Sequence, residues 1–156
     1  MKAITLWQPY ASLIACGEKK YETRSWKTDY RGAIAIHAAA REVNTLGLAP
    51  PFASAVCGAL YSVGMSIHRL PYSCIIATAE LVGCHKIVRH GGRGMSSQGT
   101  GWLETESGIY IPTEQEELFG DWTPGRYAWE LTNIKVLPEP VPAKGKQRLW
   151  EFEGNL

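Results

Sequence analysis

The sequence predicts an α+β domain built round a small, strongly bent β-sheet or barrel, with helices inserted early in the chain. Several short apolar segments with strand-like alternation are separated by turns, and longer segments with helical spacing lie in the first half. The length of 156 residues fits one domain, 1–156. A composition of 45% hydrophobic and 20% charged residues permits a core of useful size.

The first part of the chain predicts a strand, a helix and a second strand. Residues 3–7 form a short apolar strand, and Pro9 suits the first position of the following helix because its φ is already helical. Gly17 follows that helix, where a glycine readily adopts a left-handed cap. Residues 20–26 are then expected to be extended. Their alternation places four side chains on one side of the strand: Lys20, Glu22, Arg24 and Trp26.

The middle of the chain predicts two strands separated by helices. The run AIAIHAAA begins at residue 33, is apolar on both faces, and predicts a buried strand through Ala38. Residues 41–64 carry helical patterning interrupted by Pro50 and Pro51, so we expect two short helices there. Residues 74–83, CIIATAELVG, predict a strand by their alternation and their β-branched residues.

The last part of the chain combines a loop, a short helix and the longest strand signal. Residues 89–101 are glycine-rich and predict a mobile loop, without the pattern of a nucleotide-binding loop. Thr113 and Glu116 form a capping box in front of a short acidic helix. Residues 126–137 predict a long strand, and residues 138–142, PEPVP, predict a proline-stiffened segment after it.

Composition and cysteine usage narrow the function classes. The formal net charge is +1, so a basic site for a polyanion must come from local clustering. The cysteines form no CxxC pair and no zinc-type spacing with the histidines, which favours buried, reduced thiols and neither metal nor cofactor. No apolar stretch is long enough to span a bilayer, and the apolar run before Gln8 is too short for a secretion signal. A cytoplasmic protein without a membrane partner is expected.

The most informative stretch is GEKKYETRSW, which contains the pattern Gly17-x-Lys19-x-x-Glu22-x-Arg24. On a strand Glu22 and Arg24 share a face, so they either pair with each other or reach together into one cleft. An arginine favours the charged form of a carboxylate beside it, and a partly buried lysine can act as a base. Trp26 on the same side offers a stacking platform for a planar ring. The alternative is an edge strand with an ordinary surface salt bridge.

Further residues are candidate ligand contacts. Trp7 and Gln8 stand at the strand-to-helix corner before the motif, where they either face the cleft or serve as a core ring and a helix cap. Lys144 and Lys146 follow the prolines and either contact phosphates or remain solvated. Arg93 in the glycine-rich loop has the same two interpretations.

Taken together, these segments resemble an ASCH domain (activating signal cointegrator homology), a branch of the PUA-like superfamily. The segment LWQPYASLIACGEKKYETRSW is similar to the opening of that family, and AIAIHAA, IIATAELVGC, RYAWEL and EPVPAKGK resemble its later parts in the same order. The resemblance runs from residue 3 to about residue 150 and is nearest to small stand-alone prokaryotic and phage members.

The resemblance implies a PUA-like mixed β-barrel of about five or six strands with flanking helices, and a cleft that binds RNA or modified nucleosides. One bacterial branch of the family hydrolyses the amide of N4-acetylcytidine with a lysine, a threonine and a glutamate. Lys19 matches the lysine, Glu22 stands at the threonine position, and Glu80 is an approximate match for the glutamate. A carboxylate cannot be the same nucleophile as a threonine, although it can act as a general base on water.

Two functions of different classes follow from these residues. In the first, the protein binds RNA, single-stranded nucleic acid or a modified nucleoside, with Lys20 and Arg24 among its contacts. In the second, it is a hydrolase of N4-acylated cytosine nucleosides or a ribonuclease, with Lys19, Glu22 and Glu80 as the catalytic group. A protein partner at the proline-rich EPVPA segment is a third alternative. The point at which the motif strand begins decides which of the two lysines faces the cleft.

Overall fold

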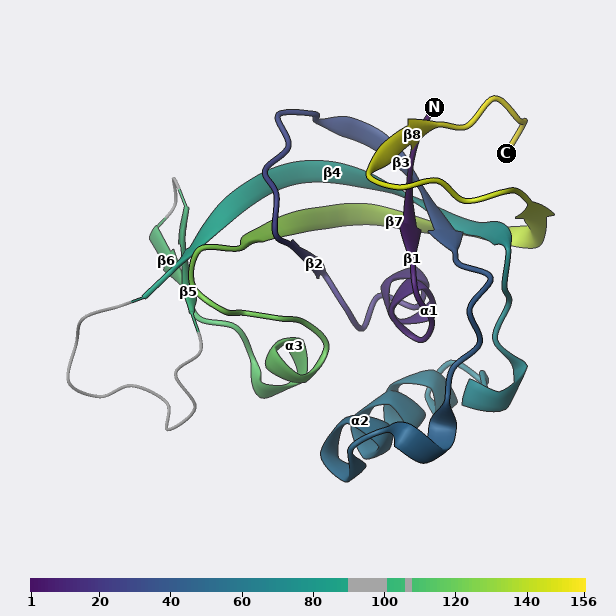
Figure 1. Ribbon diagram of the computed structural model, residues 1–156, viewed down its shortest axis with the longest axis horizontal. Helices are drawn as coiled ribbons and strands as arrows, with labels where there is room; N and C mark the ends of the chain where they lie inside the picture. The colour runs from purple at the N-terminus through teal and green to yellow at the C-terminus, as the bar shows by residue number, and fades with distance from the viewer. Residues whose placement is uncertain (90–100, 106–107) are drawn as a thin grey trace.

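The computed structural model describes residues 1–89, 101–105 and 108–156, and it confirms the predicted α+β class. Two long, curved strands arch across the molecule, and the helices gather on the inner side of the arch (Figure 1). The two ends of the chain lie close together, because the Met1 amino group donates a hydrogen bond to the Phe152 carbonyl at 2.9 Å. In the described ranges, no helix is long and apolar enough to cross a bilayer.

The described part of the chain forms one mixed sheet of eight strands: β1 (Lys2–Leu6), β2 (Tyr21–Arg24), β3 (Gly32–Ala38), β4 (Cys74–Val88), β5 (Trp102–Thr105), β6 (Gly108–Tyr110), β7 (Tyr127–Pro142) and β8 (Leu149–Glu151). The main path of the sheet has the order β2-β7-β4-β3-β1-β8. β1 and β3 run parallel, with Lys2 opposite Ile34, and the other pairs on the path are antiparallel. A hairpin of β5 and β6 extends from the end of β4.

The sheet bends strongly but does not close into a barrel. The long β4–β7 pair contains three register shifts, of which one lies between Thr78 and Glu80 and another between Leu81 and Gly83. Irregularities of this kind bend and twist a strand pair. Among the described residues, β2 and β8 stand at the two ends of the path and are not paired with each other. The implied barrel is therefore an open, curved sheet.

The two strongest strand signals mark strands that are longer than predicted. β4 continues beyond residues 74–83 to Val88, and β7 continues through residues 138–142. The expectation of a proline-stiffened segment after this strand is wrong, because Pro142 pairs opposite Cys74 in the sheet. The register shift between Ile75 and Ala77 leaves a bulge in β7, where prolines are tolerated. β5, β6 and β8 have three or four residues each and were not predicted from the sequence.

The prolines were interpreted correctly for the first helix but not for the second. The first helix begins directly after Pro9, and Gly17 behind it has a φ of 82°, as predicted. Pro50 and Pro51 begin the second helix rather than interrupting one, because the first turn needs no amide donor. The two short helices that were expected in residues 41–64 are therefore a single 3-10 turn, Thr45–Gly47, and a longer helix of 12 residues that begins at Pro50. The α-helices in the described ranges are α1 (Tyr10–Ala15), α2 (Pro50–Tyr61) and α3 (Glu114–Leu118).

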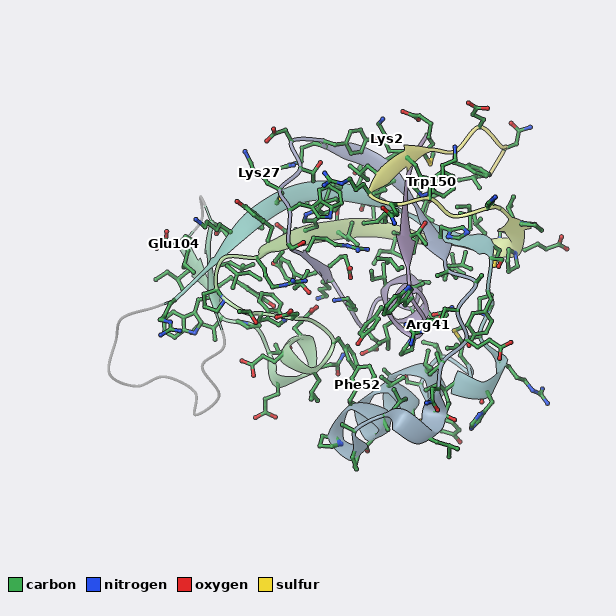
Figure 2. The ribbon with its side chains drawn as sticks, in the orientation of Figure 1. Lys2, Lys27, Arg41, Phe52, Glu104 and Trp150 are labelled. Atoms are coloured by element: carbon green, nitrogen blue, oxygen red, sulfur yellow. The ribbon has the colours of Figure 1, made fainter. Side chains whose placement is uncertain are left out.

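The core between the bent sheet and the helices gives α1 a rigid position. α1 contacts β3, β4 and β7 on one side and α2 on the other. Phe52 points from α2 toward this layer (Figure 2), where its ring centroid lies 5.8 Å from that of Tyr10 and 6.2 Å from that of Phe119. The corner between β1 and α1 is therefore held in place next to the motif strand β2.

Candidate functional site

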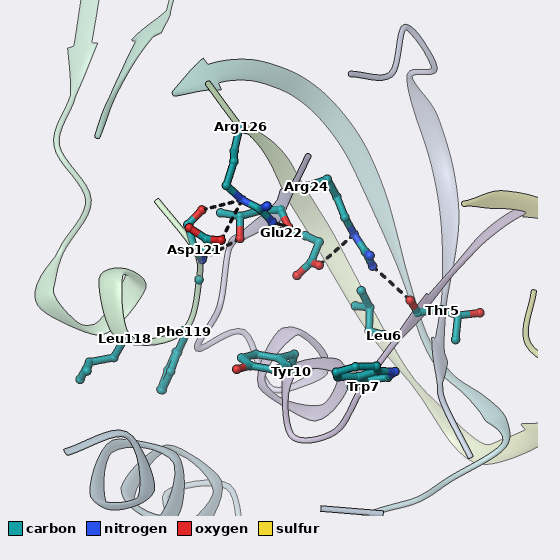
Figure 3. Close-up of a pocket in the computed structure, with 12 residues that line it drawn as sticks. Thr5, Leu6, Trp7, Tyr10, Glu22, Arg24, Leu118, Phe119, Asp121 and Arg126 are labelled. Atoms are coloured by element: carbon teal, nitrogen blue, oxygen red, sulfur yellow. Dashed lines mark hydrogen bonds and ion pairs between the residues drawn. The ribbon is translucent and has the colours of Figure 1, made fainter. Parts of the chain in front are cut away.

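An open cleft of about 420 Å³ lies between the motif strand β2, the β1–α1 corner and the segment that follows α3 (Figure 3). Small-molecule sites have volumes of roughly 300–1,000 Å³. Aromatic rings and charged groups face each other across the cleft. Its lining residues are Thr5, Leu6, Trp7, Tyr10, Glu22, Thr23, Arg24, Leu118, Phe119, Gly120, Asp121 and Arg126.

Trp7 and Tyr10 form the aromatic wall of the cleft. Trp7 is 58% exposed, and the guanidinium of Arg41 lies 4.5 Å from its ring centroid. Burial, reinforced by the negative charge of Glu22, raises the pKa of the Tyr10 phenol, so this hydroxyl stays a neutral donor at physiological pH. An exposed indole at the mouth of a cleft suits stacking against a flat ligand.

Glu22 and Arg24 form the charged wall, because alternate residues of β2 share a face while Tyr21 is buried on the opposite face. Arg24 Nε lies 3.0 Å from Glu22 Oε1, and Arg24 Nη2 donates a hydrogen bond to the Thr5 carbonyl at 3.1 Å. Arg24 Nε makes no well-aligned hydrogen bond, so its contact with Glu22 is mainly electrostatic. The guanidinium therefore spans the gap between β2 and β1.

Lys19 lies behind the charged wall and does not line the cleft. It is 1% exposed, its ammonium donates a hydrogen bond to the Tyr21 carbonyl, and Nζ lies 3.6 Å from Glu22 Oε2. Lys20 is exposed, and it does not line the cleft either. Glu22 is thus held between two cations, Lys19 on the interior side and Arg24 on the cleft side.

A second carboxylate, Glu116 of α3, reaches the interior side of this cluster. The capping box is half formed: Thr113 Oγ1 accepts from the Glu116 amide at 3.2 Å, but the Glu116 carboxylate turns away and accepts from the Lys20 amide at 2.7 Å. This cross-link ties α3 to the start of the motif strand. Burial raises the pKa of the Glu116 carboxyl, although the Lys20 amide and the Lys19 ammonium oppose the shift.

The raised pKa of Glu116 predicts a pH-dependent stability. Because the folded state holds the proton more tightly than the unfolded state, stability is lost as pH rises from the ordinary value of 4.5 through the raised pKa. Glu116→Gln keeps an oxygen acceptor for the Lys20 amide and removes the charge. In urea unfolding, we expect this variant to gain stability relative to the native protein as pH rises from below 4.5 to neutrality. A difference in free energy of unfolding that does not change with pH would contradict this account.

Among the lining residues that were not predicted as site residues are three with polar or charged side chains that face the cleft: Tyr10, Asp121 and Arg126. Arg126 Nε lies 3.2 Å from Asp121 Oδ2, and Arg126 Nη2 donates to the Thr23 carbonyl at 3.4 Å, so this pair forms the outer rim. The sequence signal for them is weak. DWTPGR predicts only a polar turn, and the fold alone brings that turn beside β2. Tyr10 stands in the sequence as one member of the apolar face of α1.

Gln8 and Trp26 do not line the cleft. Gln8 is a buried helix cap: its Nε2 donates to Ser12 Oγ at 2.8 Å, and its Oε1 accepts from the Ser12 amide at 3.1 Å. The Trp26 ring packs edge-on against the core ring of Trp129, with centroids 4.6 Å apart. Of the two tryptophans predicted as contacts, Trp7 lines the cleft and Trp26 does not.

Glu80 lies apart from the motif residues. It is exposed on β4 and accepts a hydrogen bond from Asn133 Nδ2 at 2.9 Å, and it does not line the cleft. The structure therefore groups Lys19 and Glu22 but does not bring Glu80 to them.

The other predicted contacts lie outside this cleft as well. Lys144 and Lys146 line a separate hollow beside β1. Arg93 and most of the glycine-rich loop fall outside the described residues. Within the described ranges, no three histidine, cysteine, aspartate or glutamate side chains gather where they could hold a metal ion. All four cysteines are free, but only Cys74 is buried as expected: Cys16 and Cys84 are partly buried and Cys57 is exposed.

The family comparison covers the whole cleft. A family model described as ASCH domain matches residues 4–140, a range that includes the aromatic corner, the motif strand and the turn with the outer ion pair. No curated protein matches the chain in a sequence comparison. Residues 141–156, with Lys144 and Lys146, lie beyond the matched range.

Proposed function

The chain belongs to the ASCH domain family, and we propose that it binds RNA or a modified nucleoside in the cleft lined by Trp7, Glu22 and Arg24. The observation that carries this proposal is an exposed indole facing a glutamate–arginine pair across a cavity of about 420 Å³. A flat ligand with hydrogen-bonding edges can contact both walls at once, and a nucleobase is such a ligand.

Each wall offers a contact that suits a nucleobase. Stacking of a base on an aromatic side chain contributes about 1–3 kcal/mol and tolerates any base. The Glu22 carboxylate accepts hydrogen bonds such as those from the exocyclic amine of cytosine, and the Arg24 guanidinium donates to ring nitrogens and carbonyls. The neutral Tyr10 hydroxyl adds a further donor beside them.

The charge of the chain supports a short ligand rather than a long duplex. The net charge of +1 gives no general attraction for polyanions, so binding has to come from the local groups at the cleft. Lys19 and Arg24 are matched by the carboxylates of Glu22 and Glu116, so this cluster offers hydrogen-bonding groups rather than a net positive charge. A single-stranded segment or a single nucleoside fits this arrangement better than double-stranded nucleic acid.

Trp7→Ala tests the proposal directly. Loss of one stacking ring is expected to weaken binding of a short fluorescein-labelled single-stranded RNA by about 1–3 kcal/mol, which is roughly fivefold to 150-fold in Kd. Fluorescence anisotropy at low salt measures this. Trp7→Phe keeps a ring and should retain most of the affinity. Tyr61→Ala removes an aromatic residue that is 84% exposed on α2, away from the cleft, and should leave Kd unchanged. Native-like RNA binding by Trp7→Ala would exclude the stacking role.

A second candidate function is hydrolysis, and the contact between buried Lys19 and Glu22 is the observation that favours it. In this alternative Glu22 acts as a general base on water and Lys19 orients its carboxylate, without a role for Glu80. The test incubates the protein with N4-acetylcytidine and with single-stranded RNA and follows products by mass spectrometry. Cytidine plus acetate, or shortened RNA, absent with Glu22→Gln, would support an enzyme. Intact substrates at high protein concentration would leave the binding function alone.

A further inference from the structure

A second hollow, of about 850 Å³, lies beside β1 and is bordered by the chain that follows β7. Its lining contains two lysines and a histidine and no acidic residue. We propose that this hollow, here called the lysine groove, binds the sugar–phosphate backbone of an RNA strand whose base occupies the cleft. Its lining residues are Thr5, His37, Ala39, Ala40, Ser73, Pro142, Ala143, Lys144, Gly145, Lys146 and Gln147.

The cleft and the lysine groove meet at one residue. Thr5 lines both of them, and Arg24 Nη2 donates to the Thr5 carbonyl at 3.1 Å. The guanidinium of Arg24 therefore stands at the junction, between the place proposed for the base and the groove. A nucleotide strand that leaves the cleft past Arg24 enters the groove directly. A free nucleoside in the cleft would make no contact with the groove.

The two lysines provide the charge that phosphates require. Lys144 and Lys146 lie on the segment between β7 and β8, and Lys146 Nζ lies 5.8 Å from the centroid of the Trp150 ring. Trp150 is anchored in turn, because it belongs to β8 beside β1 (Figure 2) and its Nε1 donates to Thr5 Oγ1 at 3.1 Å. A lysine held over an aromatic face at the edge of a groove without carboxylates is well placed to contact a phosphate.

His37 supplies a second, independent sign of a ligand. It is 1% exposed, and its Nε2 lies 2.9 Å from the Ala143 carbonyl, which can only accept, so Nε2 carries the proton. Nδ1 has no hydrogen-bond partner within the described chain, and in a neutral ring with the proton on Nε2 it is an acceptor. Buried polar atoms without a partner are uncommon. A ribose 2′-hydroxyl donates hydrogen bonds and is the group that distinguishes RNA from DNA.

The backbone of Gly145 packs closely against the His37 ring, and Nδ1 is buried beneath it. A Cβ on Gly145 would lie 2.8 Å from His37 Nδ1 and 2.9 Å from Thr5 Oγ1, so any larger residue would press on both. Ser73 on the facing side has a φ of 53°, and its carbonyl accepts from the Ala143 amide at 3.0 Å. Left-handed backbone at a residue other than glycine concentrates at binding sites.

This inference rests on the proposed function, and the experiment separates the two. The groove variant Lys144→Ala/Lys146→Ala is compared with Lys86→Ala/Lys135→Ala, which removes the same charge from exposed strand positions outside the groove. Four probes are used: cytidine, a short single-stranded RNA, the DNA of the same sequence and a polyglutamate peptide. We expect the groove variant to bind cytidine like the native protein and to bind RNA at least tenfold more weakly at low salt.

The salt dependence provides a second readout. Each phosphate contact on a single strand contributes about 0.7 to the slope of log K against log salt, so the groove variant should lose about 1.4. The native protein should prefer RNA over DNA. Three results would overturn the inference without affecting the proposed function of the cleft. They are native-like RNA binding by the groove variant, equal affinity of the native protein for RNA and DNA, and binding of a polyglutamate peptide by the native protein as tight as its binding of RNA. Failure of the native protein to bind either cytidine or RNA would overturn the proposed function with it.

Discussion

Arg24→Ala is expected to weaken binding of RNA and of nucleosides alike by about 1.5–3 kcal/mol, which is roughly tenfold to 150-fold in Kd. Arg24 is the one motif side chain that contacts both Glu22 and β1, through the ion pair at 3.0 Å and the hydrogen bond to Thr5 at 3.1 Å. Its removal takes away a donor for the base edge and leaves Glu22 with Lys19 alone. Isothermal titration with cytidine and anisotropy with labelled RNA measure the two losses.

Two further arginine variants test whether the contact of Arg24 with the ligand depends on its charge, on its planar shape or on its position in the cleft. Arg24→Lys keeps the charge but loses the planar fork, so we expect a loss of affinity between those of the native protein and Arg24→Ala. Arg31 offers a matched control, because it also hydrogen-bonds backbone carbonyls, at 2.8 and 3.2 Å, yet does not line the cleft. Arg31→Ala should bind like the native protein. If Arg24→Ala and Arg31→Ala have the same Kd, the cleft is not the binding site.

The cleft shows which parts of a site the sequence can predict. The motif places Glu22 and Arg24 on one face of an extended segment, and alternation alone is enough to predict that. Alternation within a strand cannot predict what stands opposite. Trp26 was expected beside the motif pair and Trp7 either at the cleft or in the core, and only the fold shows that Trp26 packs on Trp129 while Trp7 faces the motif pair. The turn with Asp121 and Arg126 is distant in sequence and has no local signal.

The same limit explains the differences in the fold. Prolines carry opposite meanings in a helix start, a helix interior and a bulged strand, and the sequence around Pro50 and Pro142 does not distinguish these contexts. Pro50 begins α2, and Pro142 pairs with Cys74 inside a sheet that short-range patterning could not detect. Closure of the sheet is likewise a property of its edges, β2 and β8, and no local pattern records whether two edges meet.

Lys19→Ala is expected to destabilise the protein by about 2–5 kcal/mol, because it leaves a cavity in place of a large buried side chain and removes the hydrogen bond to the Tyr21 carbonyl. Lys19 is 1% exposed and lies 3.6 Å from Glu22 Oε2, and its charge also opposes the burial penalty of Glu116. Domains are commonly stable by about 5–15 kcal/mol, so this loss is a large part of the whole. Urea unfolding followed by circular dichroism measures it.

The neighbouring lysine provides the matched control. Lys20 is exposed, so Lys20→Ala should change the free energy of unfolding by no more than about 0.5 kcal/mol. The double variant Lys19→Ala/Glu116→Gln should recover part of the loss, with a coupling of about 0.5–3 kcal/mol, because it also removes a carboxylate that Lys19 stabilised. If Lys19→Ala is as stable as Lys20→Ala, the buried cation is not needed for folding. A variant of that kind which still binds RNA but no longer yields product would make Lys19 part of a catalytic group.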